Sequence, residues 1–203
     1  TEVIKALFEL TKDTPKFEVL PWARAYNKAL WESNVLIYSL SKTKDRENKF
    51  HWVGPLHYQK FYFWGLSDKF AKPVSSIESL KNLPIAYSTA YNSAEYLQSL
   101  NFSKTHKVSK NAQALSMLYK GRVDTVVLND LMLKLLQGNT QFKERNLIKL
   151  YEAEGLNGYL NIAFSKNTDP AMVRRFQVAY AELERNGKLH QIREKWADKL
   201  QVN

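Results

Sequence analysis

Arg46 is the side chain whose type and setting best suit the binding of an anion. It lies in the charged run SLSKTKDRENKF, between the apolar stretch NVLIY and the aromatic-rich HWVGPLHYQKFYFW. A guanidinium offers two parallel N–H bonds to a carboxylate, which lysine cannot reproduce. Alternatively, Arg46 pairs with Asp45, Glu47 or a neighbouring part of the protein, as arginines in exposed charged runs usually do. The two interpretations differ in whether Arg46 has a ligand.

A second candidate group stands at the end of a short apolar run. NVLIYS has the length and composition of a strand covered on both faces, and it ends in Tyr38 and Ser39. Sheets of α/β proteins bind ligands beyond the carboxyl ends of their strands. Tyr38 and Ser39 are therefore predicted to border a binding site.

The sequence offers little support for catalysis. Its 4 histidines form no H-E-x-x-H pair, its 7 glycines form no P-loop or G-x-G-x-x-G motif, and cysteine is absent. A general acid would need a carboxylate with a raised pKa, for which Asp130, Glu152 and Glu154 are candidates. Solvated surface acids are the better interpretation of all three. We expect no metal, no cofactor and no enzymatic activity.

Composition and charge are those of an ordinary globular protein. Of 203 residues, 44% are hydrophobic and 25% charged, and no apolar run approaches the roughly 20 residues that cross a bilayer. The net charge of +10 suits an anionic ligand, an acidic surface or nucleic acid, but basic residues are interspersed with acids. A solvated basic surface is therefore at least as good an interpretation as a nucleic-acid-binding face. The first residues carry no signal-peptide pattern, so we expect a secretion signal to have been removed or never present.

Helical and strand patterns alternate along the chain. Helices are predicted at 1–10, with Thr1 as a possible cap, and at 22–31, 92–100 with a serine cap, 111–121 ending at Gly121, and 131–137. Two more are predicted within 169–200, parted by Gly187, with Asp169 as cap and Pro170 in the first turn. Strands are predicted at 16–20, 34–39, 83–89, 122–129 and 158–165. Strands separated by helices indicate an α/β fold with parallel sheets.

Two extended aromatic stretches are candidate domain boundaries. They are YQKFYFWG and EGLNGYLNIAF, and they flank the central segment. We predict a discontinuous lobe 1 from residues 1–58 and 159–203 and a lobe 2 from residues 59–158. A cleft between lobes is a common place for a small ligand.

Several stretches in this order resemble the amino-acid-binding type of periplasmic solute-binding proteins, extracellular solute-binding protein family 3. The stretches are VLPWARAYNKAL, SKTKDRENKFHWVGPL, LPIAYSTAYNSAEYL, LYKGRVDTVVLND and GKLHQIREKW, which together cover nearly the whole chain. The resemblance implies the type 2 periplasmic binding fold, with two lobes joined by two crossing hinge strands. PWARAY resembles a subgroup of the family. The family's first strand has no counterpart before the first helix, so we expect it to be missing from this chain.

The resemblance also implies roles for individual residues. Thr43 and Arg46 match the T-x-x-R motif, whose arginine clamps a ligand carboxylate. Asn92 and Ser93 match a helix start that meets an anionic group, where an ordinary N-cap is the alternative. Tyr91 replaces the glycine usual before this pair, so it could stack on the ligand or close the pocket.

Further positions at the same predicted site depart from the family or are specific to the subgroup. Asn129 stands where the family has the aspartate that binds an ammonium group, with Asp130 one place later, and a neutral amide weakens recognition of a cation. Trp22 and Arg24 of PWARAY could add to the cleft, although helix packing and surface charge are the favoured interpretation.

The resemblance implies a monomeric, non-catalytic periplasmic protein that captures a small anionic or zwitterionic solute by hinge closure. Its partner would be an ABC-type membrane transporter or a sensor, without nucleic acid and without a cofactor. An enzyme of the same fold, such as a dehydratase or a lytic transglycosylase, is the first alternative, and a basic nucleic-acid-binding domain is the second.

Overall fold

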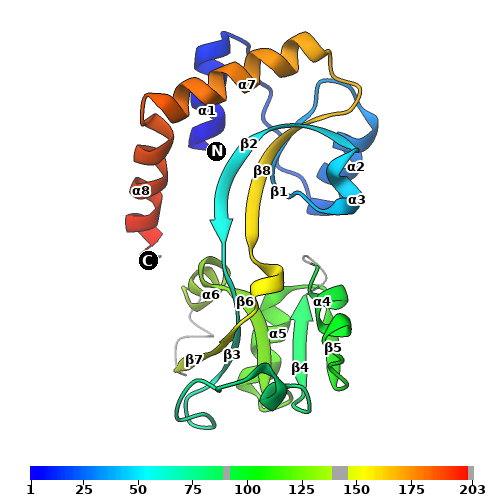
Figure 1. The fold of residues 1–203 in the computed structure, drawn as a ribbon, viewed down its shortest axis with the longest axis vertical. Coiled ribbons are helices and arrows are strands. Elements are labelled where there is room, and N and C mark those ends of the chain that lie inside the picture. Colours follow the sequence, from blue (N-terminus) through cyan, green and yellow to red (C-terminus); the bar gives the residue numbers. More distant parts are fainter. Residues whose placement is uncertain (89–91, 139–145, 201–203) are drawn as a thin grey trace. The chain divides into compact units, whose positions relative to one another are not determined.

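The structure is a computed structural model that describes residues 1–88, 92–138 and 146–200. These residues form two compact units. Unit 1 consists of residues 1–58 and 158–200, and unit 2 of residues 59–157. Figure 1 traces the chain through both units, each of which is built around its own sheet.

Unit 1 is built on a sheet of three strands in the order β1-β8-β2, namely β1 (Leu36–Ser41), β8 (Gly158–Ser165) and β2 (Phe50–Gln59). β1 runs antiparallel to β8, with Leu36 opposite Phe164. The prediction of a parallel sheet is therefore wrong here. A strand from the C-terminal part of the chain returns beside β1, and alternation along the sequence does not reveal that pairing.

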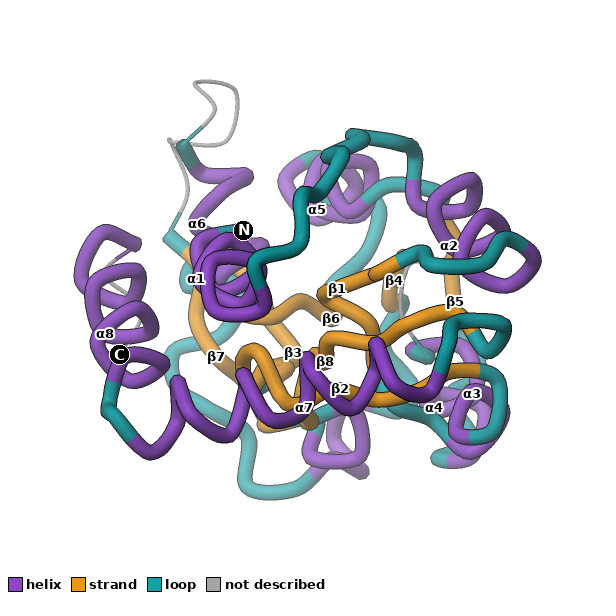
Figure 2. Tube along the Cα trace, turned by 90° about the horizontal axis from the view of Figure 1, so that it is seen from above, coloured by secondary structure: helices purple, strands orange, loops and turns teal. Residues whose placement is uncertain are grey.

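Helices pack against this sheet through apolar faces. α1 (Glu2–Thr11) and α7 (Pro170–Arg185) lie side by side in Figure 2, and α8 (Lys188–Leu200) follows α7. Leu7, Phe164 and Phe176 are fully buried or nearly so in the core that these elements share. A second cluster holds Ala29 of α2 (Trp22–Trp31) beside strand residues such as Phe50.

The start of α7 and its junction with α8 follow the sequence prediction. The Asp169 side chain accepts a hydrogen bond from the Ala171 N–H at 2.8 Å, and Pro170 occupies the first turn. Gly187 lies between the two helices with φ of 76°. That left-handed conformation suits glycine, which has no Cβ to clash with the backbone.

The strand predicted at 16–20 does not form. β1 pairs with β8 and, within the described residues, has no strand on its other edge. A cavity of about 480 Å³ lies there, lined by residues 13–18, Leu20 and Leu36 among others. Val19 is fully exposed, with a relative accessibility of 101%. A strand needs a hydrogen-bonded neighbour, and this segment has none, so it is a loop although its pattern is that of a strand.

Unit 2 is built on a mixed sheet of five strands in the order β5-β4-β6-β3-β7. Its members are β3 (Phe61–Leu66), β4 (Ile85–Ser88), β5 (Thr105–Val108), β6 (Thr125–Asn129) and β7 (Leu147–Glu152). β4 is parallel to β5 and β6, whereas β3 is antiparallel to β6 and β7. The prediction of parallel sheets thus holds only for the β5-β4-β6 part.

Both faces of this sheet are covered. One apolar cluster includes side chains of α5 (Asn111–Tyr119) and α6 (Asp130–Gln137). The other includes side chains of α4 (Ser93–Ser99) and of the 3₁₀ turns η1 (Ile77–Leu80) and η3 (Glu154–Leu156). Val123 is buried as expected, but it precedes β6 and is not part of it. The α/β class is confirmed, and no helix of the described part is long and apolar enough to span a membrane.

Candidate functional site

Arg46 lies on a single helical turn, α3 (Lys44–Glu47), that follows β1 directly. Its guanidinium carbon is 5.1 Å from the centre of the Tyr26 ring, and Nη1 donates a long hydrogen bond of 3.4 Å to the carbonyl oxygen of Ser41. The side chain is half-buried. Stacking on an aromatic ring holds the guanidinium while leaving other N–H groups free to bind an anion.

The ion pairs that would have occupied Arg46 are not formed. Glu47 lies 3.5 Å from the Lys42 ammonium, and no acid in the described part of the chain reaches Arg46. A half-buried arginine without a carboxylate partner is unusual, because burial of a charge is costly unless it is paired. The guanidinium of Arg46 is therefore positioned to accept an external anion.

A row of aromatic rings supports this arginine. The Trp22 and Tyr26 rings are 6.2 Å apart, Tyr26 and Phe50 are 5.7 Å apart, and Phe50 and Trp52 are 5.9 Å apart. The Trp52 indole donates to the carbonyl oxygen of Glu47 at 2.9 Å, which fixes the end of α3. Trp22 thus touches the Arg46 site through Tyr26.

β1 carries a strained residue two positions before its end, because the strand continues to Ser41 and does not end at Ser39 as predicted. Ser39 has φ of 62°, and the pairing register with β8 shifts between Tyr38 and Leu40. A bulge with a non-glycine residue in the left-handed region costs about 1–3 kcal/mol and is common beside functional sites. The Tyr38 hydroxyl lies 3.2 Å from Oγ1 of Thr1, so the two make a hydrogen bond.

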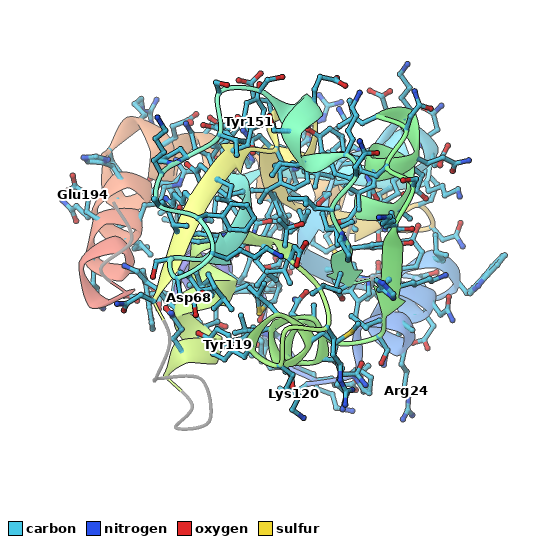
Figure 3. All side chains as sticks on the ribbon, turned by 90° about the horizontal axis from the view of Figure 1, so that it is seen from below. Arg24, Asp68, Tyr119, Lys120, Tyr151 and Glu194 are labelled. Carbon is cyan, nitrogen blue, oxygen red and sulfur yellow. The ribbon has the colours of Figure 1, made fainter. Side chains whose placement is uncertain are left out.

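Thr43 begins the helical turn that carries Arg46, whereas Arg24 lies on a different helix, α2. Thr43 is the N-cap of α3, but its hydroxyl makes no capping bond. It begins the same turn that carries Arg46. Arg24 is exposed on α2 and points outward in Figure 3. The structure brings Thr43 and Arg46 together and leaves Arg24 at the surface.

In unit 2 the candidate residues gather at one edge of the sheet. Because β5, β4 and β6 are parallel, their carboxyl ends share that edge. Asn92 is the N-cap of α4 without a side-chain capping bond, and Ser93 is the first helical residue, 1% exposed. The predicted serine cap was therefore one residue too late. Tyr91 lies outside the described residues.

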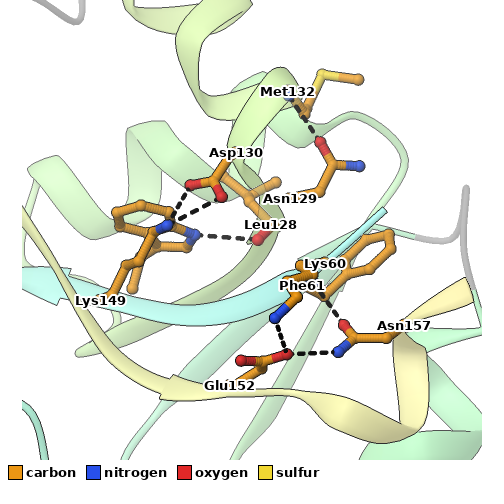
Figure 4. A network of polar contacts seen from close by, with 10 residues as sticks. Lys60, Phe61, Leu128, Asn129, Asp130, Met132, Lys149, Glu152 and Asn157 are labelled. Carbon is orange, nitrogen blue, oxygen red and sulfur yellow. Dashed lines mark hydrogen bonds and ion pairs between the residues drawn. The ribbon is translucent and has the colours of Figure 1, made fainter. Parts of the chain in front are cut away.

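Asn129 and Asp130 lie where β6 ends and α6 begins. Asn129 is 3% exposed, and its Oδ1 accepts the N–H of Met132 at 2.7 Å (Figure 4). Both carboxylate oxygens of Asp130 lie 2.9 Å from the Lys149 ammonium, which also stands 4.0 Å from the centre of the Tyr62 ring. Asp130 is therefore engaged by a cation of the protein itself.

A second polar network ties the two ends of unit 2 together. Asn157 accepts the N–H of Phe61 at 2.8 Å and donates to Glu152 at 2.7 Å (Figure 4). The Lys60 ammonium is 3.2 Å from the same Glu152. Glu152 and Asp130, two of the three carboxylates considered for catalysis, are thus held in ion pairs. Within the described residues, no group of three or more acids and histidines is arranged to hold a metal ion.

Sequence reasoning missed Tyr26, Lys149 and Asn111. Tyr26 lies one helical turn after Trp22, and its side chain was assigned to helix packing alone. Lys149 carries no local signal, because its partner Asp130 lies 19 residues earlier in the sequence and the two meet only in the folded unit, with β3 between β6 and β7 in the sheet. Asn111 opens α5 beside the same edge and is 9% exposed, and its Oδ1 has no hydrogen-bond partner among the described residues.

Comparison with known proteins identifies the fold. No protein-family model matches the chain, and no curated protein matches it. A histidine kinase sensor domain described as similar to periplasmic binding proteins matches with a TM-score of 0.80 and 19% identity, over 96% of this chain and 83% of that chain. The arginine-, lysine-, histidine-binding protein ArtJ from Geobacillus stearothermophilus matches with a TM-score of 0.74 and 18% identity, over 98% of this chain and 88% of that chain.

A mutant of ArgBP from T. maritima gives a third match, with a TM-score of 0.75 and 17% identity. It extends over 97% of this chain and 83% of that chain. At such identities the likeness is one of architecture, which many functions share. The chain therefore has the two-sheet α/β fold of the periplasmic-binding-protein type.

Proposed function

We propose that this protein binds a small anionic or zwitterionic solute without transforming it, and that Arg46 holds a carboxylate of that solute. The observation that carries the proposal is the half-buried Arg46 guanidinium, which stacks on Tyr26 and has no acidic partner in the described part of the chain. A charge in this setting is stabilised when an anion reaches it.

The roles of two structural neighbours support the same class of function. One is the substrate-binding protein of an amino acid ABC transporter, and another is a histidine kinase sensor domain. We propose by analogy that this chain serves a membrane transporter or a sensor outside the cytoplasm. We also propose, from the resemblance alone, that it belongs to the PWARAY subgroup and works as a monomer whose two lobes close on the solute.

The other candidate residues of unit 1 fit this role unequally. Thr43 lies one turn from Arg46 with a hydroxyl that α3 does not use, and Ser39 lies exposed at a strained bulge. Both could donate to a bound anion. Trp22 supports the site through Tyr26, and Arg24 contributes positive charge at the surface.

An enzymatic role is not favoured by the carboxylates. Asp130 is held by Lys149 and Glu152 by Lys60 and Asn157. A general acid must reach the reacting group of a substrate, whereas these two carboxylates are engaged by side chains of the protein itself.

A thermal-shift screen followed by calorimetry tests the proposal. The purified protein is titrated with amino acids, hydroxy acids, dicarboxylates, sugars and short peptides at neutral pH. A solute that binds the folded state raises the apparent melting temperature by mass action. We expect a saturable shift with at least one carboxylate, and a loss of affinity of about tenfold or more in Arg46→Lys and Arg46→Ala.

Arg185→Ala is the matched control, because Arg185 is exposed at the last turn of α7. It removes the same charge far along the sequence from α3 and should leave the affinity unchanged. Circular dichroism of each variant verifies folding. Unchanged affinity in a folded Arg46→Ala, or binding confined to neutral sugars, would contradict the proposal.

A further inference from the structure

The sheet of unit 1 has a strand edge without a neighbour. Within the residues that the structure describes, β1 pairs with β8 only. The Ser165 N–H donates to the Val35 carbonyl oxygen at 2.9 Å, so the backbone groups of Val35 face β8. This direction alternates along an antiparallel pair, so Ile37 also faces β8, whereas Leu36 and Tyr38 direct their N–H and C=O groups to the free edge. Such an edge is a template for another strand.

A second segment of unit 1 also lacks a neighbour. Residues 16–20 have the alternation of a strand, but their backbone groups make no hydrogen bond in the described part of the chain. This segment and the free edge of β1 line the same cavity of about 480 Å³. Two sets of unpaired backbone groups therefore border one cavity.

Helices cover this cavity on both faces of the sheet. α1 and α7 contribute Phe8 and Phe176, which pack on the face that carries the Leu36 side chain. α2 contributes Ala25 and packs on the opposite face, which carries Ile37. A strand covered on both faces is apolar at nearly every position. The cavity therefore suits an extended apolar segment.

The charged side chains that line the cavity are each paired with an opposite charge of the protein itself. The ion pairs are Asp13–Arg175 at 3.0 Å, Glu18–Lys28 at 2.7 Å, Glu18–Lys16 at 3.0 Å and Glu32–Lys28 at 3.6 Å. A charged ligand would compete with these pairs. The backbone groups lack partners instead, and the N–H and C=O groups of a strand edge are matched by another extended backbone.

We infer that this cavity is a slot for one extended peptide strand, which pairs with the free edge of β1 and gives residues 16–20 a neighbour. The occupant is a segment of a separate polypeptide, apolar and about as long as β1, which has 6 residues. Strand addition takes its affinity from main-chain hydrogen bonds and its specificity from the side chains. The inference concerns unit 1 alone and does not rest on the proposed function.

Titration with designed peptides tests the inference. The probes are acetyl-KVIVTVK-amide and acetyl-KLIFLIK-amide, which differ in side-chain size and carry lysines for solubility. The matched control is the first probe with N-methyl groups on its three valines, which removes N–H donors along one edge and keeps the side chains. Calorimetry with the 203-residue chain should show saturable one-to-one binding of at least one probe. The N-methylated control should bind at least about tenfold more weakly than the first probe, or not at all, because the slot pairs with both edges of the strand.

Hydrogen exchange measured by NMR locates the bound peptide. At saturation, exchange of the Leu36 and Tyr38 amides should slow at least about tenfold, as should exchange of amides within residues 16–20. The Ile37 amide should change little, because it faces β8 in both states. A peptide bound elsewhere on the surface would not produce this alternation.

Ala25→Phe is the blocking variant, because Ala25 lines the cavity. A folded Ala25→Phe should bind the probe at least about tenfold more weakly than the unmodified protein. Ala23→Phe adds the same ring to α2 at an exposed position that does not line the cavity, and should bind normally. Circular dichroism verifies the folding of both variants, and the N-methylated control provides the same test without a change to the protein.

Several results would overturn the inference. Equal affinities for the first probe and its N-methylated control would mean an apolar pocket without strand pairing. Failure of both probes to bind, or binding that leaves the exchange of Leu36 and Tyr38 unchanged, would exclude the slot. A concentration-dependent dimer that protects these two amides without any peptide would make a second copy of the chain the occupant, and would overturn the assignment to a separate polypeptide.

Discussion

The guanidinium of Arg46 lies over the ring of Tyr26, 5.1 Å from its centre, and the two residues come from different elements, α3 and α2. This contact turns a residue of an exposed charged run into one with a fixed position. It also supplies a cation with a favourable neighbour that leaves most of its hydrogen-bond donors free. The contact leads to a first prediction.

Replacing Tyr26 should weaken solute binding without a change of charge. Tyr26→Leu removes the ring under Arg46, and we expect an affinity loss of about 3- to 30-fold, which corresponds to roughly 0.6–2 kcal/mol of cation–π interaction. Tyr26→Phe retains the ring face and should bind nearly as well as the unmodified protein. Calorimetry with the tightest-binding carboxylate of the screen measures both, and equal losses in the two variants would exclude the ring face as the cause.

Ser39 should be sensitive to side-chain shape in a predictable direction. Because its φ is 62°, glycine at this position relieves backbone strain, whereas a β-branched residue increases it. We expect Ser39→Val to lower the free energy of unfolding of unit 1 by about 1–3 kcal/mol. Ser39→Gly should match or exceed the stability of the unmodified protein. Urea denaturation followed by circular dichroism measures the difference, and a fully stable Ser39→Val would mean that the bulge is relaxed.

Gly54 should not tolerate alanine. A Cβ at this position would lie 2.6 Å from ring atoms of Tyr180, whose hydroxyl donates to the Pro55 carbonyl oxygen at 2.7 Å and so holds the ring in place. Overpacking of this kind costs about 1–3 kcal/mol. Gly158→Ala is the control, since no heavy atom lies within 4 Å of its Cβ position. Equal unfolding midpoints for the two variants in denaturant would refute the prediction.

Local signals in the sequence were reliable where structure depends on neighbours along the chain. Asp169, Pro170 and Gly187 mark the start of α7 and its junction with α8, because a cap and a left-handed residue act within a few positions. The alternation of helices and strands likewise predicted an α/β protein. These features need no knowledge of the partner strands.

Local sequence patterns could not predict the order of the strands in each sheet, nor whether a segment with a strand pattern forms a strand. Residues 16–20 have the alternation of a strand but no hydrogen-bonded neighbour, and all of them except the exposed Val19 line a cavity beside β1. β7 was not predicted, and its partner β3 was recognised only as part of the extended stretch YQKFYFWG, because neither sequence has a clear period of two. In both cases, strand formation depends on pairing with a segment that is distant in the sequence.

The candidate site also has some features that the sequence predicts and others that only the structure reveals. The chemistry of Arg46 can be inferred from its type, but its freedom from Asp45 and Glu47 is visible only in three dimensions. That Nδ2 of Asn129 has no partner among the described residues depends on burial and on the Met132 N–H, which fixes the amide through Oδ1. The ion pair between Asp130 and Lys149 forms because the fold of unit 2 brings the two side chains together.

Glu18 gives a prediction for acid pH. Its carboxylate accepts a hydrogen bond of 2.7 Å from Lys28 and lies 3.0 Å from the Lys16 ammonium. These hydrogen bonds, that from Lys28 first, lower the pKa of Glu18 from 4.5 to about 2. The folded state thus favours the charged form, and its stabilising effect is complete above the ordinary pKa and is lost as the pH falls toward 2.

A carboxyl-carbon NMR titration measures this pKa directly. We expect Lys28→Ala to bring the pKa of Glu18 closer to its ordinary value than Lys16→Ala does, because the bond from Lys28 has the larger effect. Lys5→Ala is the control, since Lys5 is an exposed lysine of α1. In thermal melts, the difference between the unmodified protein and Glu18→Gln should be constant above about pH 5 and should shrink below pH 4.5 as Glu18 takes up its proton. A pKa near 4.5 in the unmodified protein would show that neither lysine holds the carboxylate in solution.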